Sequence, residues 1–213
     1  MKTVNLKELY SLQAGLDAEI AKNHGINYEN TIERRLLALI VEIGEFANET
    51  RCFKFWSNKG PSPKDVIMDE YADGMHFLLS LGIPLGAKKY EYNLRKSHKD
   101  LTTQILEVYK ACIALKTHFD LKHYEKAFQS YLNLSQAVKM KPEDIIDSYK
   151  KKLDVNYVRQ QTNYWDKAPN IGVFSYLKSR VNVLTTATQY CLIILRKRGY
   201  KNGKCKCKNW RYH

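Results

Sequence analysis

Two pairs of carboxylates stand at matching spacing in the chain. Glu42 and Glu45 are three residues apart, and so are Glu70 and Asp73. On a helix, residues three apart project from the same face, about one turn from each other. Two such pairs on consecutive antiparallel helices can meet and supply four oxygen donors. Oxygen donors suit a hard divalent cation such as Mg²⁺, which is usually shared with substrate phosphates.

The residues around each pair are apolar. Ile40, Ile43 and Phe46 flank the first pair, while Met75 and Phe77 lie close to the second. Carboxylates on a helix face that points toward a core are costly unless something positive neutralises them. Such pairs are also common on solvated helices. The spacing alone therefore leaves a metal site and ordinary surface charge both open.

Cationic and polar side chains that could hold a polyphosphate follow near residue 160. Lys152, Asn156 and Arg159 share one face of a predicted last helix, and Tyr164 lies just past it. Arginine binds phosphate through a planar fork and lysine binds it as a point charge. A solvated, lysine-rich helix end that complements the helix dipole explains these residues equally well by themselves.

The segments that must position these residues have helical periodicity. Apolar residues recur every three or four positions over residues 3–22, 29–49, 101–116 and 121–138. Ser62, Pro63 and Asp65 predict the start of another helix, which Gly82 ends, and Pro142 begins a last one. No segment alternates with a period of two. We therefore expect an all-α helical bundle, with the metal site between consecutive antiparallel helices.

Charge is distributed unevenly over the 213 residues, whose net charge is +13. Residues 165–213 hold eleven basic residues and one acidic residue, so +10 lies there and only +3 lies in residues 1–164. We expect an all-α domain over 1–164 and a basic, partly disordered extension over 165–213. The extension could bind nucleic acid non-specifically, but its lack of helical patterning also fits an inert segment.

Composition argues against membrane and secreted proteins. No apolar run reaches 18 residues, and the first ten residues lack the apolar run of a secretion signal. The five cysteines, an odd number without regular spacing, fit reduced thiols better than a disulfide framework. We expect a cytoplasmic protein that has no membrane partner.

Five motifs occur in order along the chain: LQAGLD at 12–17, EIGEFANE at 42–49, CFKFW at 52–56, DEYADGMHF at 69–77 and KLDVNYVRQQTNY at 152–164. Together they resemble the motifs of the dimeric all-α dUTP pyrophosphatases, within the wider all-α nucleoside-triphosphate pyrophosphohydrolase superfamily. The resemblance covers about residues 5–164. It implies a homodimer that takes dUTP or dUDP as substrate.

The resemblance also assigns roles to individual residues. It implies that Mg²⁺, or Mn²⁺ as a substitute, is bound by Glu42, Glu45, Glu70 and Asp73. It places the base near Gln13, Asp17, Trp56 and His76, and the phosphates near Lys152, Asn156, Arg159 and Tyr164.

Three of the assignments near the base stay open at this point. Asp17 stands where many members have asparagine, which puts its role in doubt. A histidine on an apolar helix face, such as His76, is often a core residue. The aromatic residues Trp56 and Phe53 either stack near the base or pack in the core, and general tendencies favour the core.

The expected reaction is hydrolysis of dUTP to dUMP and pyrophosphate, by attack of a metal-bound water on the α-phosphorus. Glu45 is the carboxylate that we expect to orient or deprotonate this water. One alternative is a pyrophosphohydrolase for another nucleoside triphosphate, such as dCTP. Another is a regulatory protein that binds a repressor, as some phage-type members do. A phage-encoded enzyme would act in the cytoplasm of its bacterial host.

Overall fold

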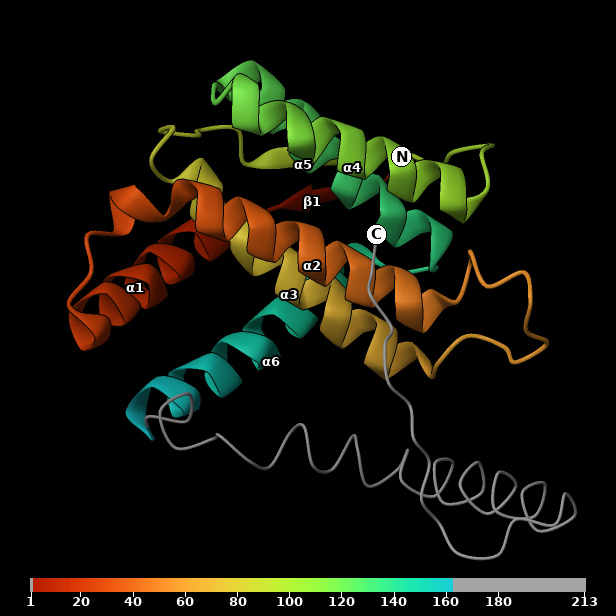
Figure 1. The fold of residues 1–213 in the computed structure, drawn as a ribbon, viewed down its shortest axis with the longest axis horizontal. Helices are drawn as coiled ribbons and strands as arrows, with labels where there is room; N and C mark the ends of the chain where they lie inside the picture. The colour runs from red at the N-terminus through yellow and green to blue at the C-terminus, as the bar shows by residue number, and fades with distance from the viewer. Residues whose placement is uncertain (1, 163–213) are drawn as a thin grey trace, which may run out of the picture. The chain divides into compact units, whose positions relative to one another are not determined.

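The structure is a computed structural model that describes residues 2–162, and every structural statement below refers to these residues. Six α-helices, one 3₁₀ turn and two short strands follow one another (Figure 1): β1 (Lys2–Asn5), α1 (Lys7–His24), η1 (Tyr28–Thr31), α2 (Ile32–Thr50), α3 (Lys64–Gly82), β2 (Glu91–Leu94), α4 (Leu101–Thr117), α5 (Leu121–Ala137) and α6 (Pro142–Gln161). The all-α prediction is confirmed. Within the described range, no helix is long and apolar enough to span a membrane.

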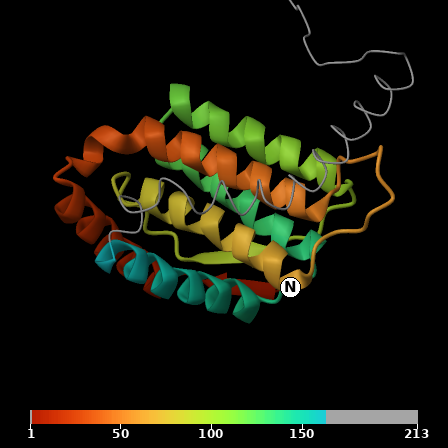
Figure 2. The ribbon, with the colours of Figure 1, turned by 60° about the horizontal axis from the view of Figure 1, so that its bottom comes forward.

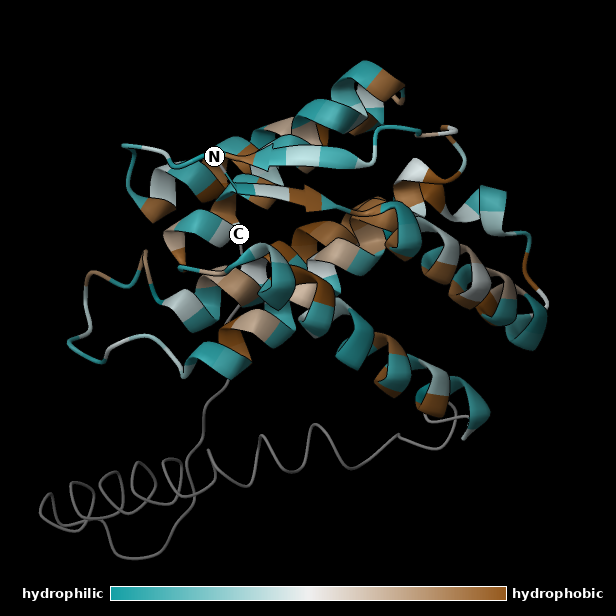
Figure 3. Cartoon of the chain, turned by 180° about the vertical axis from the view of Figure 1, so that it is seen from behind, coloured by the Kyte–Doolittle hydropathy of each residue, from teal (hydrophilic) through white to brown (hydrophobic). Residues whose placement is uncertain are grey.

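Helix α3 lies at the centre of the bundle. It packs against α2, α6, α1 and α5, while α4 packs against both α5 and α2. Figure 1 shows α2 and α3 side by side and running in opposite directions, and Figure 2 shows α6 along the other flank of α3. The outer helices carry polar and apolar stripes (Figure 3) and bury mainly one face, whereas α3 is buried on most sides from Tyr71 to Gly82.

The expectation that no strand is present was wrong. β1 and β2 form a two-stranded antiparallel sheet in which Val4 lies opposite Tyr92. α1 consequently begins at Lys7 rather than at residue 3, and β2 occupies a connection in which no strand was expected. Each strand has only four residues, and the two lie far apart in the chain. Such short segments give too few alternating positions for periodicity to detect.

Several helix boundaries lie at glycine or proline residues. Gly25 ends α1 in the left-handed conformation, and its N–H donates to Ala21 and Lys22 carbonyls. As predicted, α6 begins at Pro142 and α3 begins directly after Pro63. Ser62 does not cap α3, because its hydroxyl instead donates to the Glu49 carboxylate.

A close approach between α3 and α5 fixes the part of α3 that carries two of the predicted metal ligands. A side chain at Gly74 would overlap the ring of Tyr131. Tyr131 is fully buried, stacks on Tyr71 with 4.8 Å between ring centroids, and donates a hydrogen bond of 2.8 Å to the Tyr71 carbonyl. Glu70 and Asp73 are therefore carried by a segment that is locked to its neighbour.

Candidate active site

Carboxylates from two helices converge between α2 and α3. One carboxylate oxygen each of Glu42, Glu45 and Glu70 lies within 4.8 Å of the other two. We call these three residues the carboxylate cluster. Glu45 is exposed and the other two are half-buried. Three oxygen donors in one half-buried place are a donor set that fits a hard divalent cation.

Two carboxyls of the cluster have raised pKa values, because their ionised forms are unfavourable in this environment. Burial first, and then the nearby carboxylates of Asp73, Glu45 and Glu70, raise the pKa of Glu42 to about 7. Burial, followed by the charges of Glu45 and Asp73, likewise raises the pKa of Glu70 to about 7. In the metal-free protein these two carboxyls therefore hold protons near neutral pH, and a bound cation would favour their ionised forms.

The fourth predicted ligand, Asp73, lies outside the cluster's 4.8 Å group because its carboxylate pairs with a lysine. Lys152 Nζ is 2.6 Å from Asp73 Oδ2 and 2.8 Å from Asp69 Oδ2, and its side chain is only 8% exposed. Burial lowers the pKa of Lys152, but hydrogen bonds to the two aspartates outweigh burial and leave it raised. The ammonium is thus a fixed positive charge at the edge of the site.

Residues predicted for phosphate binding extend from this lysine along α6. Asn156 and Arg159 are one and two turns beyond Lys152, and Arg159 Nη1 donates to Asn156 Oδ1 at 3.4 Å. All three side chains thus lie on one face of α6, as the spacing predicted. Tyr164 lies outside the described residues.

A second set of polar residues, around Gln13 and His76, is buried between α1, α3 and α6. The side chains at its centre are uncharged. Gln13 Oε1 accepts hydrogen bonds from Tyr149 Oη at 2.9 Å and from His76 Nδ1 at 2.8 Å. Because Gln13 Oε1 can only accept, this contact assigns the ring proton of His76 to Nδ1. Burial lowers the pKa of His76 to about 3, so its ring is neutral at physiological pH.

His76 Nε2 is therefore an unprotonated acceptor. It is buried and has no hydrogen-bond partner among the described residues. Its ring stacks on Tyr149 with 4.1 Å between centroids, which holds it in place. A buried acceptor without a donor costs free energy, and a ligand with a suitably placed N–H would remove that cost.

Asp17 orients this network through a hydrogen bond to the amide of Gln13. Its carboxylate accepts from Gln13 Nε2 at 2.7 Å, from Tyr28 Oη at 2.9 Å and from Ser80 Oγ at 2.7 Å. Arg35 Nη1 in turn donates to the carbonyl and hydroxyl of Ser80. Burial raises the pKa of Asp17, whereas these hydrogen bonds and Arg35 oppose the rise. The protein's own donors thus engage both oxygens of Asp17.

The aromatic segment after α2 lies outside the core, so the core interpretation of Trp56 and Phe53 was wrong. Trp56 is 64% exposed and Phe55 is 94% exposed. The rings of Phe53 and Phe55 contact Trp56 edge to face. Arg51 ends α2 in the left-handed conformation, and the segment that follows contacts α4 at Cys52 but leaves Phe55 and Trp56 in solvent. Contact between Trp56 and the base stays a prediction.

Several residues of the site escaped the sequence analysis. Asp69 stands four residues before Asp73 and therefore shares its helix face, but exposed acids at this spacing are common. Arg35 and Tyr149 belong to no motif with known chemistry. Only their burial and long-range hydrogen bonds reveal their role.

Comparison with protein families identifies a related family. A family model described as dUTPase matches residues 5–164, a range that contains all five sequence motifs. No curated protein gives a significant match.

The network around Asp17 leads to a prediction about stability. Replacing Asp17 with alanine removes the shared acceptor of two buried donors, on Gln13 and Ser80, and of the half-buried Tyr28 hydroxyl, so Asp17→Ala should lower the free energy of unfolding by about 2–4 kcal/mol. Urea denaturation in the presence of a chelator measures this change. Glu19→Ala, in the same helix and without a hydrogen bond or ion pair from its side chain in the described structure, serves as the control and should change stability by about 0.5 kcal/mol or less. Equal effects of the two variants would contradict the assignment.

Proposed function

The chain belongs to the all-α dUTPase family and is a dUTP diphosphatase, and we propose that it hydrolyses dUTP to dUMP and pyrophosphate with Mg²⁺ at the carboxylate cluster. Convergence of the cluster supports this proposal most directly: its carboxylate oxygens lie close together, the pKa values of Glu42 and Glu70 are raised, and a cation would favour the ionised forms of both. Mn²⁺, which favours the same oxygen ligands, would be a substitute.

The residues that would hold the ion are the cluster and Asp73. When bound, a divalent cation supplies neutralisation of the triphosphate and a more acidic water. Glu45 is the most exposed member of the cluster, so its carboxylate is accessible to a water molecule at the mouth of the site. We assign to Glu45 the acceptance of a proton from the water that attacks the α-phosphorus.

Lys152 and Arg159 would hold the phosphates. In the metal-free protein the ammonium of Lys152 is held by Asp69 and Asp73. If Asp73 bound a cation, its carboxylate would attract this ammonium less strongly and leave Lys152 free to hold a substrate phosphate. Asp69 then keeps the lysine close to the site, and Arg159 supplies the second cationic group on the same face of α6.

The buried polar residues around Gln13 favour uracil over cytosine. Uracil presents an N3–H donor, whereas cytosine presents an unprotonated N3 at the same position. His76 Nε2, a buried acceptor held in one tautomer by Gln13, complements the donor and leaves the cytosine nitrogen facing another acceptor. Buried polar groups discriminate strongly against a ligand that leaves them unpaired. This observation supports dUTP rather than dCTP as substrate.

We infer further that the enzyme is a homodimer, as the family resemblance implies, and that a second copy covers an apolar face of α2 and α4. Leu37 and Val41 on α2, and Leu106 and Ile113 on α4, are all exposed. The two helices pack together around an apolar groove of about 240 Å³, to which Leu106 contributes. Burying such a continuous apolar face stabilises association. Glu45 lies on the same helix, one turn from Val41, so the partner would border the active site.

The reaction is tested by pyrophosphate release from dUTP in the presence of Mg²⁺. Glu45→Gln should lower kcat at least about 100-fold, because the variant keeps the shape of the side chain but cannot accept the proton. Glu33→Gln, at an exposed position in the first turn of α2, is the control and should keep the wild-type rate. A Glu45→Gln enzyme as active as wild type would contradict the assigned role, and wild type without activity on dUTP would contradict the function. Equal kcat/KM for dUTP and dCTP would contradict the role of His76.

The dimer is tested by light scattering after size-exclusion chromatography. Wild type at micromolar concentration should have twice the chain mass of 24.9 kDa. Leu106→Glu places a charge in the apolar face and should give the monomer. Leu121→Glu, at an exposed leucine at the start of α5, is the matched control and should remain dimeric. A monomeric wild type, or a dimer unaffected by Leu106→Glu, would refute this interface.

A further inference from the structure

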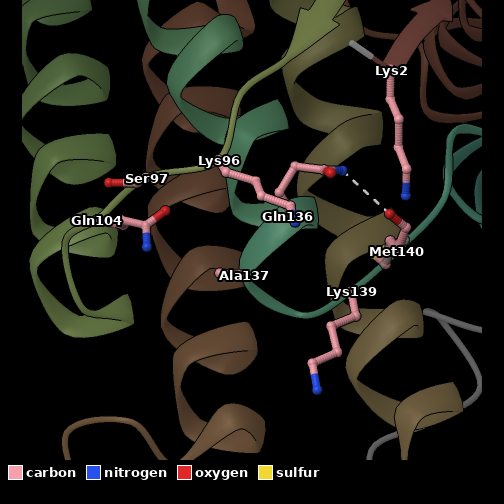
Figure 4. Close-up of a pocket in the computed structure, with 8 residues that line it drawn as sticks. All are labelled: Lys2, Lys96, Ser97, Gln104, Gln136, Ala137, Lys139 and Met140. Atoms are coloured by element: carbon pink, nitrogen blue, oxygen red, sulfur yellow. Dashed lines mark hydrogen bonds between the residues drawn. The ribbon is translucent and has the colours of Figure 1, made fainter.

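A pocket of about 380 Å³ lies outside the elements that carry the carboxylate cluster. It is lined by Lys2, Lys96, Ser97, Gln104, Gln136, Ala137, Lys139 and Met140 (Figure 4). These residues come from β1, from the segment after β2, from α4, and from the end of α5 with the connection that follows it. The volume is in the range of small-molecule sites, roughly 300–1,000 Å³. We call it the basic pocket.

The charge of the basic pocket is one-sided. Lys2, Lys96 and Lys139, all exposed, line it from three separate segments of the chain, which Figure 4 labels. No carboxylate lines the pocket. In the described part of the protein, none of the three lysine side chains makes an ion pair or a hydrogen bond. Three cationic residues on the rim of one cavity favour a bound anion over a bound cation.

Hydrogen bonds hold the walls of the pocket in place. Gln136 Nε2 donates to the Met140 carbonyl at 3.2 Å (Figure 4), and Gln104 Nε2 donates to the Lys99 carbonyl at 2.8 Å. The N–H of Arg95 donates to Asn133 Oδ1 at 3.0 Å, which anchors the segment that carries Lys96 on α5. The protein's own hydrogen bonds therefore fix these walls.

Lys139 occupies a backbone position that usually selects another residue. Its φ of 58° lies in the left-handed region, just after α5 ends at Ala137. Glycine is the common residue at such a position because it has no Cβ to clash. Lys139 lacks the conformational freedom of glycine, but it adds a cationic residue to the lining of the pocket.

We propose that the basic pocket binds a small phosphate-bearing anion through the ammonium groups of Lys2, Lys96 and Lys139. Lysine ammonium groups bind phosphate as point charges. The amide nitrogens of Gln104 and Gln136 are already engaged by backbone carbonyls, so the pocket recognises charge rather than a base. Its concave shape fits a free anion, such as pyrophosphate, better than the backbone of a nucleic acid. The site shares no residue with the carboxylate cluster and does not depend on catalysis.

The experiment is a titration of the full chain with pyrophosphate in chelator-containing buffer, followed by calorimetry and by amide chemical shifts in NMR spectra. Without divalent cations the carboxylate cluster repels this anion. We expect amide shifts at Lys96, Ser97 and Lys139, and an affinity at least about tenfold weaker in the double variant Lys96→Gln/Lys139→Gln. The single variant Lys96→Gln, at an exposed position, should weaken binding about threefold. It keeps the test valid if Lys139→Gln disturbs the left-handed turn.

A charge-matched control separates the pocket from general electrostatics, including any contribution of the basic residues 165–213. Lys110→Gln/Lys126→Gln removes two exposed lysines of α4 and α5 and should bind pyrophosphate within about twofold of wild type. Equal weakening in the control and pocket variants would overturn the proposal. Binding of a single-stranded oligonucleotide without terminal phosphates, but not of pyrophosphate, would overturn it as well. Both pocket variants should hydrolyse dUTP at the wild-type rate.

Discussion

Three carboxylates share a half-buried space between α2 and α3, and the arrangement around them depends on how their charge is neutralised. Protons can do so near neutral pH, because the pKa values of Glu42 and Glu70 are raised to about 7. On one side Lys152 already neutralises Asp73. A divalent cation would balance the remaining negative charge. Because Tyr131 of α5 holds α3 at Tyr71, α3 cannot easily move away from α2 to reduce the repulsion between the carboxylates.

The register between α3 and α6 joins the two halves of the site. His76 of α3 stacks on Tyr149 of α6, and three residues away along both helices Asp73 pairs with Lys152. Three residues on a helix span roughly 4.5 Å of axis. A single helix pair thereby sets the distance between a neutral end that suits a nucleobase and a charged end that suits phosphates. Gln13 on α1 fixes the neutral end, since its amide engages both His76 and Asp17.

The sequence carried enough information to predict the helices and the carboxylates, because both repeat at helical spacing. It could not reveal the pairing of Val4 with Tyr92, since four-residue strands have no detectable period and their pairing is long-range. Asp69 looks like any exposed acid until the fold brings Lys152 to it. The exposure of Trp56 follows the left-handed turn at Arg51. An arginine at that position does not predict such a turn. The division at residue 164, the properties of residues 165–213 and a repressor partner remain predictions.

Protons and a divalent cation should compete for the carboxylate cluster. Calorimetric titration with Mg²⁺ in buffers of different ionisation enthalpy counts the protons displaced on binding. Because the two raised pKa values are about 7, we expect release of about one proton in total at pH 7, more at pH 6 and almost none at pH 9. Mg²⁺ affinity should rise over the same interval. Proton release that is absent, or that does not change between pH 6 and pH 9, would contradict this competition.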